Sequence, residues 1–141
     1  MKESQFQTEF AKRNQVVGVF ELKLCKGKSM PFSALAPHQK QALLDVSSEA
    51  GLYHKISDSP FFKDPKGRMR FTCPKPFDSF FLMNIDAYLV VFFYIPRKKK
   101  AVYYIRIEDF IRMEHEANRK SFTAEMAEDY AEQVVNYMIK Y

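Results

Sequence analysis

A glutamate and a lysine two residues apart, Glu21 and Lys23, stand in the apolar segment GVFELKL at residues 18–24. Side chains alternate along a strand, so both would point to the same face. A carboxylate can hold a hard divalent cation that polarises a phosphate, and a nearby lysine can stabilise negative charge on hydroxide and phosphate oxygens. The same spacing also fits a plain Glu–Lys ion pair at the exposed end of a strand, which would offset the cost of burying either charge alone.

The helix expected at residues 33–51 carries a second candidate residue, Gln39. Helical spacing aligns Gln39 with Leu43 and Val46, so its amide should be buried and hydrogen-bonded. Two interpretations stay open: the amide satisfies a backbone group of the sheet, or it lies against Glu21 and Lys23 and orients the lysine, a water or a phosphate. The adjacent His38 is expected to be exposed or structural, because no serine or cysteine nucleophile is placed to use it.

Residues 16–58 resemble the PD-(D/E)XK nuclease superfamily, most closely its Holliday-junction-resolvase-like and phage-encoded members. The shared pattern is GVFELKL, then a basic turn, then PFSALAPHQKQALL and a terminal glycine; the later segment PFDSFF is also similar. The resemblance implies a restriction-endonuclease-like fold, in which helices flank a central mixed β-sheet, and endonuclease activity that depends on Mg²⁺ or Mn²⁺. It assigns Glu21 and the carbonyl of Leu22 as metal ligands, Lys23 as the catalytic lysine, and Gln39 as a supporting or phosphate-contacting residue.

One feature departs from the family pattern, which places a metal-binding aspartate on a strand upstream of the Glu-x-Lys segment. Residues 1–20 contain no aspartate, and their two acids, Glu3 and Glu9, fall on the first expected helix. Glu9 is a candidate for an additional acid. The best candidate for the missing ligand is Asp78, if its strand lies beside the Glu-x-Lys strand in a rearranged, permutation-like fold. The alternative is that Asp78 only caps the start of that strand after Pro76.

Three basic segments could follow a phosphate backbone. They are the turn with Lys26 and Lys28, the stretch from Lys63 to Lys75 that includes Arg68 and Arg70, and the turn with Arg97, Lys98, Lys99 and Lys100; Lys40 on the helix is a further candidate. Aromatic residues beside the second segment could stack on bases. Solvated turns that protect strand edges from aggregation are the alternative interpretation of the same charges.

Composition limits the classes of protein to consider. The 141 residues suit one domain, 1–141, and the formal net charge of +5 with a pI of about 9.1 favours an anionic partner. The two cysteines, Cys25 and Cys73, form no metal-binding pair, so zinc is not expected. The N-terminus lacks an apolar signal segment, and the longest apolar run, residues 87–95, is too short for a membrane span. We expect a cytoplasmic protein without membrane contact.

Apolar periodicity and turn residues predict a mixed α/β order of elements that would position these side chains. The helices expected are 3–13, 33–51, 108–116 and a last one capped by Thr123, with the stripe Met126, Tyr130, Val134 and Tyr137; the strands are 16–25, 52–58, 77–83, 87–95 and 101–107. A turn at residues 84–86 would join two of the strands as a hairpin. Residues 59–76 are expected to form a long loop.

Taken together, the residues and the resemblance predict a Mg²⁺- or Mn²⁺-dependent DNA endonuclease that acts on branched or duplex DNA. The resemblance to resolvases further implies a homodimer. The absence of an upstream aspartate favours an alternative, a catalytically inactive relative that only binds nucleic acid. A basic protein-interaction domain is a third possibility, which an absence of salt-dependent DNA binding would favour.

Overall fold

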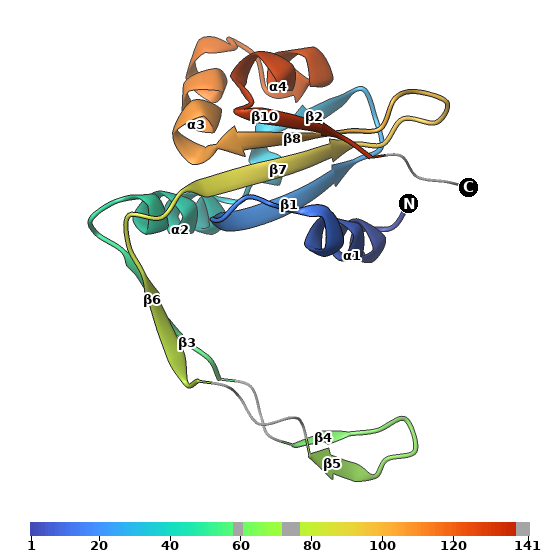
Figure 1. The fold of residues 1–141 in the computed structure, drawn as a ribbon, viewed down its shortest axis with the longest axis vertical. Helices are drawn as coiled ribbons and strands as arrows, with labels where there is room; N and C mark the ends of the chain where they lie inside the picture. Colours follow the sequence, from blue (N-terminus) through green and yellow to red (C-terminus); the bar gives the residue numbers. More distant parts are fainter. Residues whose placement is uncertain (58–60, 72–76, 138–141) are drawn as a thin grey trace.

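The computed structural model describes residues 1–57, 61–71 and 77–137. Four α-helices flank a mixed β-sheet in these ranges, as the sequence predicted for the fold class (Figure 1). No helix among the described residues is both long and apolar enough to cross a membrane.

The central sheet has the strand order β1-β7-β8-β10. Strand β1 (Val19–Cys25) runs parallel to β7 (Ala87–Phe93), with Glu21 opposite Leu89. Strand β8 (Ala101–Arg106) is antiparallel to β7, and β10 (Gln133–Asn136) is antiparallel to β8. Every residue of β7 is buried, which agrees with its continuous run of apolar and aromatic side chains.

The two faces of the sheet carry separate apolar layers. Helix α1 (Glu3–Arg13) covers one face, where Phe6 and Phe10 pack with the even-numbered residues of β1 and β7. Helices α2 (Pro37–Ser47), α3 (Ile107–Glu116) and α4 (Ala124–Tyr130) cover the other face and pack with the odd-numbered residues. Glu21 and Lys23 therefore belong to the face of β1 that α2 covers.

Short elements connect the sheet to α2. Strand β2 (Ser29–Pro31) pairs with β9 (Ser121–Thr123), and the 3₁₀ turn η1 (Phe32–Ala34) precedes the helix. Helix α2 begins at Pro37, whose fixed φ suits a first helical turn. Beyond its end, Gly51 adopts a φ of +73°, and a side chain there would meet the ring of Phe81.

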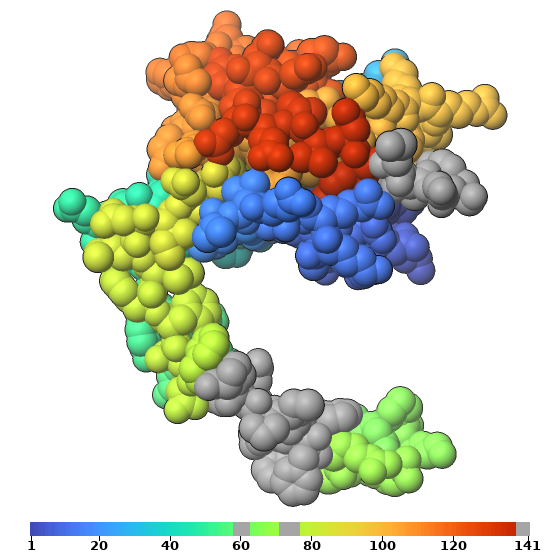
Figure 2. Space-filling view, in the orientation of Figure 1, coloured from blue at the N-terminus to red at the C-terminus, as the bar shows by residue number. Residues whose placement is uncertain are grey.

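A long arm interrupts the chain between α2 and β7. It consists of the antiparallel pair β3 (Leu52–Lys55) and β6 (Ser79–Leu82), followed outward by the hairpin β4 (Phe61–Lys63) and β5 (Met69–Phe71). Figures 1 and 2 show the ribbon of β3 and β6 projecting away from the sheet.

Three predictions of local structure are wrong. Residues 84–86 do not form a hairpin turn, because β6 pairs with β3 whereas β7 pairs with β1 and β8. The stretch expected to be a long loop contains the β4–β5 hairpin. The last helix ends at Tyr130, so Val134 of its expected stripe lies in β10, where it pairs with Tyr103. Its cap is as predicted, since the Thr123 side chain accepts from the N–H of Met126 at 3.3 Å.

Candidate functional site

Glu21 and Lys23 lie in the middle of β1 on the face toward α2. The Nζ of Lys23 is 3.1 Å from Oε1 of Glu21, and the two side chains are 20% and 29% exposed, respectively. Both charges are therefore partly desolvated but still reachable from solvent. This environment differs from the ion pair at an exposed strand end that the spacing also allowed.

Gln39, in the first turn of α2, completes the cluster. Its Nε2 donates to Oε1 of Glu21 at 3.0 Å, and its own Oε1 accepts from the backbone N–H of Ala36 at 3.1 Å. The amide thus joins the start of the helix to the middle of the strand. Of the two interpretations left open by the sequence, the structure shows Gln39 lying against the Glu21–Lys23 pair.

The other oxygen of the Glu21 carboxylate is Oε2. Lys23 and Gln39 both contact Oε1, and Oε2 accepts no hydrogen bond from the described residues. An anionic oxygen that is fixed in place but unengaged can accept a hydrogen bond or coordinate a cation.

The backbone of β1 adds a second oxygen. The N–H of Val19 donates to the carbonyl of Asp86, and the carbonyl of Cys25 accepts from the N–H of Tyr94. The backbone N–H and C=O groups of the odd-numbered residues of β1 therefore face β7. Because these groups alternate along a strand, the carbonyl of Leu22 points the other way. It faces the edge of the sheet where no described strand pairs with β1.

No family model, curated protein or solved structure matches this chain. The resemblance to PD-(D/E)XK nucleases therefore rests on the sequence pattern alone.

Asp78 does not join this cluster. The prediction that its strand lies beside β1 is wrong, because β6 pairs with β3 and the partner of β1 is β7. Asp78 precedes β6 in the arm, where its carbonyl accepts from the N–H of Ile56. Among the described residues, no group of three or more His, Cys, Asp or Glu side chains could hold a metal ion. A metal shared by Asp78 and Glu21 is thus not supported.

Glu9 lies on the wrong side of the sheet for the role of an additional acid. It belongs to α1, which packs on the face opposite α2. Its Oε2 pairs with the Nε of Arg13 at 3.0 Å, one helical turn away. Glu9 therefore has a local partner and is not brought to Glu21.

The basic candidates fall into three groups. Five are exposed in turns at the ends of β1 and β7, namely Lys26, Lys28, Arg97, Lys98 and Lys99. Lys40 instead pairs with Glu114 at 2.7 Å and ties α2 to α3. Arg68 and Arg70 pair with Asp64 in the arm, and Lys75 lies outside the described residues.

The expectation that Lys100 contacts nucleic acid is wrong. Its residue is only 8% exposed, and its Nζ donates to the carbonyl of Ile95. The same ammonium lies 4.3 Å from the centre of the Tyr94 ring. Lys100 therefore holds the turn between β7 and β8 together and is turned away from solvent.

Sequence patterns did not predict a charged network at the opposite end of the strands from the turn that holds Lys100. The guanidinium of Arg106 contacts Glu132 at 2.7 Å and Asp86 at 3.1 Å, and Glu132 also accepts from the hydroxyl of Tyr88 at 2.6 Å. Hydrogen bonds from Arg106 and then Tyr88 lower the pKa of Glu132. Desolvation, followed by the bond to Glu132, raises the pKa of Tyr88 to about 12. The network links β7, β8 and the segment before β10.

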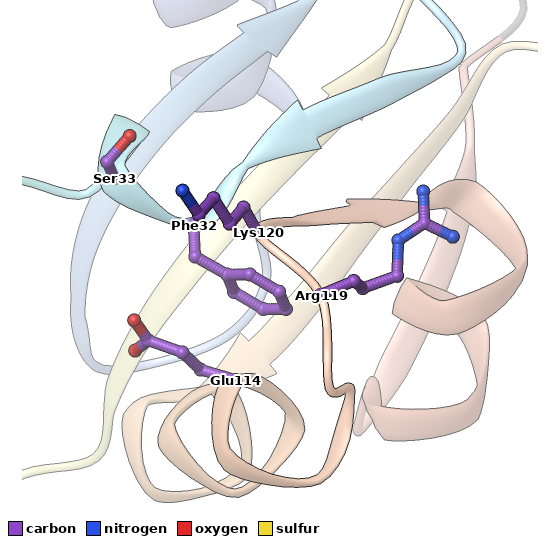
Figure 3. A pocket seen from close by; sticks show the side chains of 5 residues that line it. All are labelled: Phe32, Ser33, Glu114, Arg119 and Lys120. Carbon is purple, nitrogen blue, oxygen red and sulfur yellow. The ribbon is translucent and has the colours of Figure 1, made fainter.

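A pocket of about 260 Å³ lies beside η1, α3 and the start of β9 (Figure 3). It is lined by Phe32, Ser33, Glu114, Arg119 and Lys120. Its lining includes none of Glu21, Lys23 or Gln39, and Glu114 is engaged by Lys40. The pocket is therefore separate from the candidate site.

Proposed function

We propose that this chain is a metal-dependent endonuclease that hydrolyses phosphodiester bonds in DNA, with Glu21 and Lys23 at its reactive centre. The observation that carries the proposal is that Lys23 and Gln39 both hold Oε1 of Glu21, so that Oε2 stays available to a cation.

The oxygen donors fit a hard cation that takes only a few of its ligands from the protein. Mg²⁺ commonly keeps several waters and is held by one or two carboxylates together with phosphates of the substrate. Glu21 supplies one carboxylate, and the carbonyl of Leu22 faces the open edge of the same strand. We therefore expect weak binding of Mg²⁺ or Mn²⁺ by the free protein and tighter binding when DNA supplies further oxygens.

Each residue of the cluster has a distinct role. A bound divalent cation supplies Lewis acidity to the scissile phosphate and lowers the pKa of water. Glu21 would bind the cation through Oε2, while Gln39 fixes the rotamer of that carboxylate from the first turn of α2. Lys23 places a positive charge on the same face, where it stabilises the negative oxygens of the phosphate during attack. A branched substrate and a homodimer follow from the resemblance and stay predictions.

The test is cleavage of a four-way DNA junction and of a matched linear duplex, with Mg²⁺ or Mn²⁺ present and with EDTA. We expect Glu21→Ala and Lys23→Ala to lower the rate by at least about 100-fold, since each removes a group that acts on transition-state charge. Glu49→Ala and Lys12→Ala alter exposed residues of the same types elsewhere and should leave the rate unchanged. Cleavage by the Glu21 and Lys23 variants at the wild-type rate would exclude this site.

A second function is favoured by one observation: the described residues contain no group of three or more His, Cys, Asp or Glu side chains that could hold a metal ion. In that case the chain binds DNA without cutting it. Negligible, equal cleavage by the wild type and both variants, with salt-dependent DNA binding retained, would establish the binding function in place of the nuclease.

A further inference from the structure

The ribbon of β3 and β6 lacks a core of its own beyond its root. Leu52 and Leu82, which face each other at the root, pack against the core beneath α2. Farther out, the facing pair Tyr53 and Phe81 is 64% and 56% exposed. An isolated two-stranded ribbon is only marginally stable in water, so packing within the ribbon alone does not account for the arm.

At the outer hairpin, one carboxylate organises the turn between β4 and β5. The Oδ1 of Asp64 accepts from the backbone N–H groups of Lys66 and Arg68, both at 2.9 Å. Its Oδ2 accepts from the Nε of Arg68 at 3.0 Å and from the Nε of Arg70 at 3.1 Å. The backbone bond from Arg68 is the largest of the contributions that lower the pKa of Asp64, so this carboxylate stays ionised at neutral pH.

The two arginines are thereby held side by side on one carboxylate oxygen of Asp64. Each uses only its Nε on Asp64, and among the described residues the terminal nitrogens of both guanidiniums make no hydrogen bond. The arginine side chains are 57% and 50% exposed, whereas Asp64 is 12% exposed. A pre-ordered guanidinium loses less entropy on binding a phosphate, for which its planar fork is well matched.

The arm and the helical side of the molecule have net charges of opposite sign. The described part of the arm has two acids, Asp64 and Asp78, against five cations, Lys55, Lys63, Lys66, Arg68 and Arg70. Residues 107–136 have the opposite balance, with three cations, Arg112, Arg119 and Lys120, against the acids Glu108, Asp109, Glu114, Glu116, Glu125, Glu128, Asp129 and Glu132. A polyanion is therefore attracted to the arm and repelled by the helices.

We infer that the arm is a DNA-binding element. Arg68 and Arg70 bind the phosphate backbone of a duplex, and Asp64 holds the two arginines in place for this contact. A two-stranded ribbon is narrow enough to enter the major groove of a duplex. Two arms of the same charge repel each other, which disfavours pairing of the arms of two copies. The inference does not require cleavage at Glu21.

Binding of a fluorescently labelled duplex, followed by anisotropy in EDTA, tests this surface without interference from cleavage. The double variant Arg68→Ala/Arg70→Ala should bind about tenfold more weakly, and the slope of log affinity against log salt should fall by about 2. Arg112→Ala/Arg119→Ala removes the same charge from the helical side and is the matched control. Equal loss of affinity in the two double variants would overturn the inference, because net charge alone would then explain binding.

The variant Asp64→Asn tests whether DNA binding depends on the ordering of the two arginines or only on their charge. Asparagine keeps an oxygen for the N–H groups of Lys66 and Arg68, but its amide nitrogen cannot accept from the arginines. Loss of a negative charge alone would strengthen DNA binding, whereas loss of the ordered pair should weaken it by about two- to fivefold. Binding as tight as that of the wild type, or tighter, would overturn the role of Asp64.

The remaining outcomes separate this inference from the proposed function. Arm-dependent binding without any cleavage contradicts only the nuclease. If cleavage depends on Glu21 but the arm variants bind DNA as tightly as the wild type, only the inference about the arm is contradicted. If sedimentation shows self-association that the double arm variant abolishes, while DNA binding is unchanged, then the arm's partner is a second copy and the inference fails.

Discussion

The Nε2 of Gln39 lies 3.0 Å from Oε1 of Glu21, and this bond connects the first turn of α2 with the middle of β1. The Ala36 N–H holds the other end of the same amide. Rotation of the Gln39 amide would replace both bonds with clashes between like groups, so its orientation is set from two sides. The start of α2 therefore determines which oxygen of Glu21 is left open.

Replacing Gln39 by leucine should disorder the Glu21 carboxylate while keeping a side chain of similar size. We expect about a 10- to 100-fold loss of Mn²⁺ affinity or cleavage rate, the range typical of residues that orient metal ligands. Titration calorimetry with Mn²⁺ measures the affinity directly. Gln41→Leu, two residues along and exposed, is the control; equal effects of the two substitutions would argue against a positioning role for Gln39.

Arg106→Ala should destabilise the sheet, because Glu132 and Asp86 both lose their shared partner. The side chain is 38% exposed, so solvent screening limits the loss to about 1–2 kcal/mol in urea unfolding. Arg112→Ala removes an arginine whose ion pair is with Asp109, one turn away on α3, and whose guanidinium lies 5.0 Å from the centre of the Tyr130 ring. It should cost about 0.5–1 kcal/mol. If Arg106→Ala lowers the free energy of unfolding no more than Arg112→Ala does, the network contributes little to stability.

The lowered pKa of Glu132 predicts a dependence of stability on acid. The folded protein binds this proton less readily than the unfolded chain, so the contribution is complete above the ordinary pKa of 4.5 and is lost as the pH falls through the lowered value. Glu132→Gln should therefore flatten the decline of unfolding free energy below about pH 4.5. Urea titrations from pH 3 to pH 7 measure it, and parallel curves for the two proteins would contradict the prediction.

Lys100→Ala should lower stability without weakening DNA binding. The substitution removes the bond to the carbonyl of Ile95 and the contact with the Tyr94 ring, with an expected cost of about 1–3 kcal/mol. The neighbouring Lys99→Ala, at an exposed position, should leave stability unchanged. A DNA-binding defect in Lys100→Ala, at unchanged stability, would restore the role that its sequence position suggested.

Gly18→Ala should strain the start of β1. A Cβ at this position would lie 2.7 Å from the carbonyl oxygen of Asp86 and 3.0 Å from the Tyr88 ring, so the paired strands must separate. The expected cost is about 1–3 kcal/mol, measured by thermal or urea unfolding. Gly27→Ala is the matched control, because its nearest neighbour would be 3.9 Å away. Equal stability of the two variants would show that the strand ends adjust freely.

Local patterns in the sequence were sufficient for much of the fold. Alternation placed Glu21 and Lys23 on one face of a strand, helical spacing placed Gln39 on the inward side of α2, and Thr123 marked the start of α4. These features depend on the period of a single element and on hydrogen bonds within one turn, both of which neighbouring residues specify.

Only the tertiary structure decided which strands pair and which charges are buried. Asp78 and Glu21 were candidates for one site until β6 paired with β3, and Lys100 looked like its exposed neighbours until the turn folded over Tyr94. Strand pairing and burial depend on contacts between residues distant in the chain, and the period of a strand carries no record of its partner. The same limit hid the ribbon of the arm: the sequence predicts strands near β3 and β6, while their pairing with each other is a long-range property.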